Sequence, residues 1–259
     1  MSNQIKHRER GSGAPLVLVH GFPLDGRVFD DQLDALSARH RVIVPDLPGF
    51  GLSQPYDVAE MSMSWLAGQL HSYLQSINAL PCVLGGLSMG GYVSMSFVKT
   101  FPADVMALLL IDSRAEADTD EGKQNRNRMI EAARARGMTA VVEMMFGKML
   151  AQSTTHQRPQ VAEKLRQIMR DQPVDTVCAA IGAMRDREDF TPLLASIRTP
   201  TLVMVGEYDV ITPPEVAQRM RDGLPRSWIA RVEGAGHIST MEQPERVNAA
   251  ILKMLDEIK

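Results

Sequence analysis

The chain has 259 residues, of which 44% are hydrophobic and 23% are charged, and its formal net charge is −3. These values are ordinary for a globular protein with one large core. A net charge so close to zero excludes the strongly basic surface by which proteins bind nucleic acids or anionic membranes.

The two cysteines, Cys82 and Cys178, lie in separate apolar stretches, so we expect buried free thiols in a reducing compartment. Residues 1–15 contain no apolar segment typical of a secretory signal. No apolar run approaches the roughly 20 residues that a membrane-spanning helix needs. These features predict a cytoplasmic protein without nucleic-acid or membrane partners, and they leave both a monomer and a homodimer open.

Short apolar runs typical of buried strands alternate with helical patterns along much of the chain. Residues 4–15 alternate and then turn at glycine, which predicts a short antiparallel edge strand. Helices are expected at 59–77 and 88–100, and parallel strands at 16–20, 41–46, 82–86, 106–112, 201–207 and 228–234. This alternation predicts an α/β fold, with a mostly parallel sheet and helices on both of its faces.

The alternation stops between residues 113 and 192, where only helical patterns occur. Residues 141–150 are one helix candidate, and two apolar stripes at helical spacing mark others. The stripes are Val161, Leu165, Ile168 and Met169, and then Val174, Val177, Cys178, Ile181 and Met184. We therefore expect a core made of residues 1–112 and 193–259 and a helical cap made of residues 113–192.

Residues 86–90 read Gly-Leu-Ser-Met-Gly and lie between an expected strand and an expected helix. This is the G-x-S-x-G pattern of the nucleophile elbow, in which a sharp turn projects the serine hydroxyl above the sheet. Side chains two residues either side of the serine would collide with the turn, so glycine is needed at both positions. Ser88 is therefore the candidate nucleophile; the alternative is a glycine-rich turn without chemistry. The phosphate-binding pattern G-x-G-x-x-G is absent.

A serine hydroxyl needs a base, and the base needs an acid that orients it. His237, in a loop after the last expected strand, is the candidate base, while His20 is expected to make structural hydrogen bonds near the site. Asp209 follows the strand at 201–207 and is the candidate acid. Asp112 is its rival, and Glu207 is a weaker one. The remaining histidines are expected at the surface: His7, His40, His71 and His156.

Acyl transfer also needs hydrogen-bond donors for the oxyanion that forms on the carbonyl. In the nucleophile-elbow arrangement these are backbone N–H groups of the loop after an early strand and of the residue after the nucleophile. The candidates are therefore the N–H groups of Phe22 and Met89. Asp46 also ends a strand, and we expect it to fix the local turn.

Five segments together resemble the α/β-hydrolase superfamily, in its order and spacing and along nearly the whole chain. They are HGFPLDGRVFD (20–30), VPDLPGFGLS (44–53), GLSMGGYVS (86–94), TPTLVMVGEYD (199–209) and GAGHISTMEQPERVN (234–248). The resemblance implies an eight-stranded, mostly parallel sheet with a helical cap. It is strongest to the branch of carboxylesterases, 3-oxoadipate enol-lactonases and cofactor-free haloperoxidases. Serine at position 88 departs from epoxide hydrolases and haloalkane dehalogenases, which carry aspartate there.

These observations predict a serine hydrolase that cleaves a small, largely apolar carboxylic ester or lactone through an acyl-enzyme, with no metal or cofactor. One alternative is an enol-lactonase, in which Arg114, Glu116 and Arg134 meet a substrate carboxylate instead of being solvated. Another is acyl transfer to peroxide or to an alcohol in place of water. A ligand receptor of the same fold without catalysis is the alternative from a different class.

Overall fold

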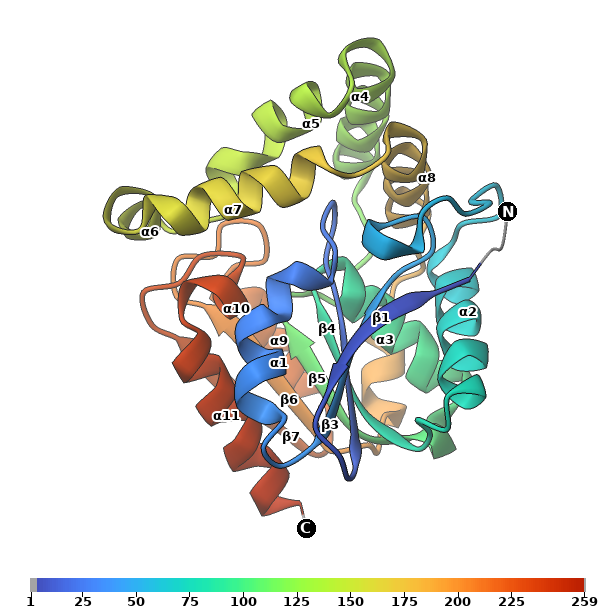
Figure 1. The fold of residues 1–259 in the computed structure, drawn as a ribbon, viewed down its shortest axis with the longest axis vertical. Helices are drawn as coiled ribbons and strands as arrows, with labels where there is room; N and C mark the ends of the chain where they lie inside the picture. The colour runs from blue at the N-terminus through green and yellow to red at the C-terminus, as the bar shows by residue number, and fades with distance from the viewer. Residues whose placement is uncertain (1–3, 259) are drawn as a thin grey trace.

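A sheet of seven strands runs through the middle of the protein, in the order β1-β3-β2-β4-β5-β6-β7 (Figure 1). The structure is a computed structural model, and it describes residues 4–258. Strands β2 to β7 are parallel, whereas β1 pairs antiparallel with β3 at the edge of the sheet. The strands are β1 Lys6–Arg10, β2 Pro15–Val19, β3 Arg41–Asp46, β4 Cys82–Leu87, β5 Val105–Ile111, β6 Thr201–Gly206 and β7 Ser227–Val232.

The α/β-hydrolase fold expected from the sequence is confirmed, but the number of strands implied by the resemblance is wrong. Instead of eight strands, residues 4–258 form seven, which is the number of strand-like runs found along the chain itself. Strand β1 forms the edge and reads Lys-His-Arg-Glu-Arg. Charged side chains of this kind discourage an edge strand from pairing with a further strand.

Helices cover both faces of the sheet, because successive side chains of a strand point to opposite faces. In β2, Val17 and Val19 belong to one buried cluster and Leu16 and Leu18 to another. The first cluster includes residues of α2 (Met63–Ser76), α3 (Met89–Thr100) and α9 (Pro214–Gly223). The second includes residues of α1 (Asp30–Leu36), α10 (Ser239–Glu242) and α11 (Pro244–Glu257). Burial on both faces explains why the parallel strands read as continuous apolar runs.

The helices between β5 and β6 form a cap over one end of the sheet (Figure 1). They are α4 Asp120–Arg136, α5 Met138–Met145, α6 Gln152–Gln157, α7 Pro159–Arg170 and α8 Val174–Arg185. The apolar stripe of α7 joins the cluster of α1 and α11, and that of α8 joins the cluster of α2 and α3. The cap therefore spans both layers. Within residues 4–258, no helix is both long enough and apolar enough to cross a bilayer.

Short 3₁₀ helices complete the secondary structure of the connecting segments. They are η1 Gly26–Phe29, η2 Gly51–Ser53, η3 Pro102–Asp104, η4 Phe146–Lys148 and η5 Thr191–Ser196. Segment η4 lies within the predicted helix 141–150, so that helix is split between the end of α5 and η4.

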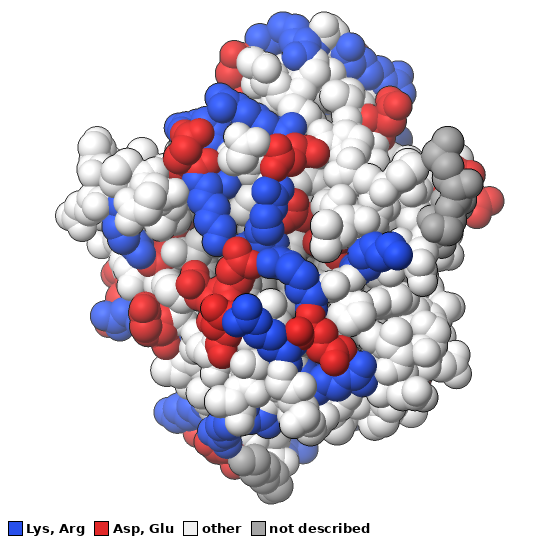
Figure 2. All heavy atoms as spheres, in the orientation of Figure 1, with Lys and Arg blue, Asp and Glu red and all other residues white. Residues whose placement is uncertain are grey.

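Polar contacts hold the end of α7 against the core. The Nε2 group of Gln172 donates to Asp25 Oδ2 at 2.9 Å, and its Oε1 accepts from the Gly51 N–H at 3.1 Å. Nearby, Lys164 of α7 pairs with Asp30 of α1 at 2.8 Å. Figure 2 shows acidic and basic side chains intermixed across this face of the molecule. The cap is thus fastened here by paired charges and amide hydrogen bonds.

The burial of individual side chains follows expectation for the cysteines but not for three of the four histidines expected at the surface. Cys82 and Cys178 are free and buried, as predicted. His40 is buried rather than at the surface. His7 and His71 are half-buried; the ring of His7 packs edge-on against Tyr73, and that of His71 stacks on Phe101 with the ring centroids 3.7 Å apart. The surface prediction rested on polar or helical surroundings in sequence, whereas tertiary packing decides the burial of these three rings.

Candidate functional site

Ser88 lies at the sharp turn between β4 and α3. Its backbone has φ 51° and ψ −111°, a conformation that residues other than glycine rarely adopt. The Ser88 N–H donates to Ile111 O at 2.8 Å, and Ser113 Oγ donates to Ser88 O at 2.9 Å. Ile111, at the end of β5, and Ser113 therefore hold the strained turn in place.

Two glycines give this turn the space that it needs. A Cβ atom at Gly86 would lie 2.1 Å from Gly90 O, and one at Gly90 would lie 2.2 Å from Val19 O. Because both obstacles are backbone carbonyls, neither can rotate aside as a side chain would. The structure thus gives the physical reason for glycine on both sides of Ser88.

Three side chains singled out in the sequence meet above the sheet. The Nε2 atom of His237 lies 2.9 Å from Ser88 Oγ, and its Nδ1 atom lies 2.8 Å from Asp209 Oδ2. His237 and Asp209 are 2% and 3% exposed. An ionised carboxylate only accepts hydrogen bonds, so the proton of the neutral ring is assigned to Nδ1, and Nε2 accepts from Ser88. The arrangement can take a proton from Ser88 Oγ.

The Asp209 carboxylate is fixed by its own loop. Its Oδ1 accepts from the N–H groups of Ile211 at 2.8 Å and Thr212 at 2.9 Å, and its Oδ2 accepts from Thr212 Oγ1 at 2.6 Å. Burial raises the pKa of Asp209, but the charge of His237 and these hydrogen bonds outweigh it and hold the pKa below its ordinary value. The carboxylate is therefore ionised at neutral pH.

The same pair makes His237 more basic than a free imidazole. Burial lowers the pKa of His237, but the charge and the hydrogen bond of Asp209 outweigh it, and Asp112 adds to their effect. The net result is a pKa above the ordinary value of 6.5. His237 thus binds a proton more firmly than an isolated ring would, which makes its neutral form a stronger general base.

Asp112, the rival acid, is fully buried and makes no hydrogen bond to the His237 ring. Its carboxylate accepts from the Gly206 N–H at 2.8 Å and from the N–H and Oγ of Ser239 at 3.1 and 2.6 Å. Burial, and then the charge of Asp209, raise its pKa to about 8. Asp112 therefore releases its proton less readily than an ordinary aspartate, and it joins the end of β6 to the segment after His237.

Two other acidic side chains, Asp46 and Glu207, accept hydrogen bonds from backbone N–H groups of nearby loops. Asp46 accepts from the N–H groups of Gly26 at 2.6 Å and Leu52 at 2.7 Å, in agreement with the turn-fixing role expected of it. Glu207 accepts from the Gly234 N–H at 3.1 Å and so joins the loops after β6 and β7. Neither carboxylate is hydrogen-bonded to His237.

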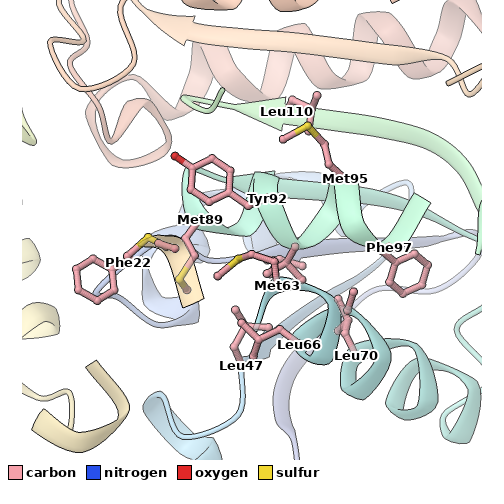
Figure 3. Packing of buried hydrophobic residues seen from close by; sticks show 14 of the residues in the cluster. Phe22, Leu47, Met63, Leu66, Leu70, Met89, Tyr92, Met95, Phe97 and Leu110 are labelled. Atoms are coloured by element: carbon pink, nitrogen blue, oxygen red, sulfur yellow. The ribbon is translucent and has the colours of Figure 1, made fainter. Parts of the chain in front are cut away.

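The two candidate oxyanion donors belong to backbone segments that adjoin Ser88. Met89 is the first residue of α3, where helix geometry leaves the N–H without an acceptor in the helix. Gly21, just before Phe22, approaches so closely that a Cβ there would lie 3.2 Å from Ser88 Cβ. The side chains of Phe22 and Met89 belong to one buried cluster (Figure 3). This packing fixes the backbone that carries both N–H groups.

His20 fixes the loop before Phe22. Its Nε2 accepts from the Leu47 N–H at 3.0 Å, so the proton of the ring is on Nδ1, which donates to Gly21 O at 2.9 Å. Burial lowers the pKa of His20 and keeps the ring neutral. His20 therefore makes the structural hydrogen bonds that the sequence predicts for it.

The three charged residues considered as ligands of a substrate carboxylate all contact protein groups. Arg114 donates to Ile211 O in the Asp209 loop. Glu116 pairs with Arg219 at 2.9 Å. Arg134 lies beside the thiol of Cys178, where its charge opposes the rise in pKa that burial causes.

Sequence reasoning missed the side chains that hold Asp209, Ser88 and Asp112 in place. These are Thr212, Ser113 and Ser239, respectively. Thr212 has a local signal, because an aspartate that accepts from N–H groups two and three residues later is a recurring turn. Ser113 and Ser239 act on partners far away in sequence and have no such signal.

Known proteins share this fold. The model of the alpha/beta hydrolase family matches residues 16–250. A thermophilic esterase from Thermogutta terrifontis, solved with malate bound, has a TM-score of 0.95 and 40% identity, over 98% of this chain and 93% of the esterase. The AB hydrolase superfamily protein YisY of Bacillus subtilis is 28% identical over 93% of this chain and 91% of its own length. The enol-lactonase of Burkholderia xenovorans LB400 shares the fold, with a TM-score of 0.88 at 20% identity over 97% of this chain and 96% of the enol-lactonase. The chain therefore belongs to the alpha/beta hydrolase family.

Proposed function

We propose that this protein is a serine hydrolase that cleaves small, largely apolar carboxylic esters or lactones through an acyl-enzyme. The observation that carries the proposal is the chain of hydrogen bonds from Ser88 Oγ through His237 to Asp209, at 2.9 and 2.8 Å. The Thermogutta terrifontis esterase, 40% identical to this chain, supports esters as the substrate class.

In the first half of the proposed reaction, Ser88 Oγ attacks the carbonyl carbon while its proton passes to His237 Nε2. Asp209 holds the Nδ1 proton and stabilises the imidazolium that forms. The N–H groups of Phe22 and Met89 donate to the oxyanion, and losing one such donor costs about 2.7–4 kcal/mol of transition-state stabilisation. The proton on Nε2 then passes to the departing alcohol oxygen, which leaves the acyl group on Ser88.

In the second half, water replaces the alcohol. His237 Nε2 takes a proton from the water as its oxygen attacks the acyl carbon, and the same N–H groups again stabilise the oxyanion. Collapse of this intermediate breaks the bond to Ser88 Oγ, which recovers its proton from Nε2. The carboxylic acid leaves and the enzyme is restored.

Turnover of a panel of p-nitrophenyl esters and lactones tests the proposal. Ser88→Ala should lower kcat by about 10⁶-fold, the scale seen when a serine acting in such a unit is removed. Ser76→Ala, at an exposed serine at the end of α2, is the matched control and should behave as the wild type. Full activity of Ser88→Ala would refute the proposed nucleophile.

The panel should include both neutral and carboxylate-bearing substrates. The contacts of Arg114 with Ile211 O and of Glu116 with Arg219 favour neutral esters, because both side chains are already engaged by protein groups. Malate, a dicarboxylate, was bound in the structure of the Thermogutta terrifontis esterase, so anionic esters are the informative comparison. The ratio of kcat/KM for the two classes measures the preference.

A further inference from the structure

A second buried carboxylate, Glu242, lies between the His237 loop and the cap. Its side chain is fully buried at the end of α10. The Oε1 atom accepts from the Gly236 N–H at 2.8 Å, and the Oε2 atom accepts from the Ala151 N–H at 2.8 Å and from Thr154 Oγ1 at 2.7 Å. One carboxylate oxygen thus binds the loop that carries His237, and the other binds the start of α6 in the cap.

The cap backbone also touches the His237 loop directly. The His237 N–H donates to Met149 O at 3.0 Å. A Cβ atom at Gly236 would lie 2.6 Å from Ala151 N and 2.8 Å from the carbonyl carbon of Leu150. Residues 149–154, which we call the cap clamp, therefore pack against the backbone of Gly236 and His237.

We propose that Glu242 is a positioning residue that couples the cap clamp to His237 and so keeps Nε2 within reach of Ser88 Oγ. This inference rests on the proposed serine hydrolase function. No step of the proposed reaction involves the Glu242 carboxylate itself. It acts on the reaction only through the backbone of Gly236 and His237.

The chemistry of the contacts explains why a carboxylate is needed at this position. The groups that hydrogen-bond to the Glu242 carboxylate all act as donors, and an ionised carboxylate can accept from all of them. A glutamine has nearly the same shape, but its NH₂ group would face at least one N–H or O–H donor. That leaves a buried polar group without a partner, and the loop or the clamp must move to relieve the conflict.

The expected effect on catalysis follows from the geometry of proton transfer. A displacement of about 1 Å of a reacting group costs about 100-fold in rate. Glu242→Gln should therefore lower kcat/KM for p-nitrophenyl acetate by about 10- to 100-fold. Thr154→Val removes one of the two cap-side contacts of Glu242, together with a hydrogen bond from Arg158 to the same hydroxyl at 3.3 Å, and should give a smaller loss in the same direction.

Gln172→Leu is the matched control for general loosening of the cap. Gln172 also joins the cap to the core, through Asp25 and Gly51, but it has no contact with the His237 loop. All three variants are compared with the wild type at equal fractions of folded protein, set from thermal unfolding curves. We expect kcat/KM of Gln172→Leu to stay at the wild-type value.

A second measurement reports on His237 without any substrate. The proton that Nδ1 shares with Asp209 gives a low-field ¹H resonance, which should shift or broaden in Glu242→Gln and stay in place in Gln172→Leu. Wild-type kcat/KM together with an unshifted resonance in Glu242→Gln would overturn the proposal. Should Glu242→Gln fail to fold, the same two results in Thr154→Val would overturn it. Failure of the wild type to hydrolyse esters would refute the proposed function instead, because the resonance still tests the coupling.

Discussion

The replacement Asp209→Asn separates the orientation of His237 from its mere presence. Of the two carboxylate oxygens, Oδ1 accepts from two backbone N–H groups, while Oδ2 faces His237 Nδ1 and Thr212 Oγ1. An asparagine keeps the first pair of bonds when its oxygen takes the place of Oδ1. Its NH₂ group then faces the ring and donates to Nδ1, so the ring proton moves to Nε2. A ring protonated at Nε2 cannot accept the proton of Ser88.

The expected loss is large because the wrong tautomer is the more stable one. In serine hydrolases with this arrangement, such a change lowers kcat by about 10⁴-fold, which corresponds to about 5.5 kcal/mol in activation free energy. The protein should still fold, since all four contacts of the side chain can be replaced by hydrogen bonds of the amide.

The assay is steady-state hydrolysis of p-nitrophenyl acetate, with thermal unfolding as the check on folding. Asp112→Asn is the matched control, because Asp112 is also a buried carboxylate near His237 but makes no hydrogen bond to the ring. We expect a much smaller loss in this control. A folded Asp209→Asn protein with kcat near the wild-type value, or a 10⁴-fold loss confined to Asp112→Asn, would refute the assignment of the acid.

Three further predictions follow from the pKa values and the turn. The acid limb of the kcat/KM profile should lie above pH 6.5, because Asp209 raises the pKa of His237 and the protonated ring cannot act as a base; a midpoint at or below pH 6.5 would contradict this. Asp112, with its pKa raised to about 8, holds its proton more firmly in the folded than in the unfolded state, so its contribution to stability falls as the pH rises through its folded pKa. Urea titrations at pH 5 and pH 8 should therefore show the unfolding free energy of the wild type, relative to Asp112→Asn, decreasing with pH; a constant difference would be evidence against it. Gly90→Ala should destabilise the fold by about 3 kcal/mol, because the new Cβ would lie 2.2 Å from a backbone carbonyl of β2. Gly182→Ala, where the Cβ meets open space within α8, is the control and should be neutral or stabilising.

The sequence predicts those parts of the site that have a local pattern. Ser88 sits between a strand and a helix, and its flanking glycines follow from the geometry of one tight turn. Asp209 and His237 each follow a strand, and the carboxyl ends of parallel strands meet at one edge of a sheet. Local reasoning could therefore bring these three residues to the same edge, where the structure has them in hydrogen-bond contact.

Contacts between distant segments were beyond the reach of such patterns. Glu242 lies in a stretch quoted for its family resemblance, yet its partners Ala151 and Thr154 lie about 90 residues earlier, in the cap. His40 has polar neighbours in sequence but is buried by tertiary packing. The strand count was wrong for a different reason. Six apolar runs and the alternating segment within residues 4–15 indicate seven strands, whereas the family resemblance adds an eighth that residues 4–258 do not form.

The central claim is that His237 activates Ser88 as a nucleophile, and covalent labelling tests it most directly. The protein is treated with an alkyl fluorophosphonate, digested and examined by mass spectrometry, and the labelling rate is measured as a function of pH. We predict a single adduct on Ser88, formed at a rate that falls as His237 becomes protonated and that is nearly abolished in His237→Ala. An adduct on another residue, or labelling of Ser88 at an undiminished rate in His237→Ala, would contradict the account.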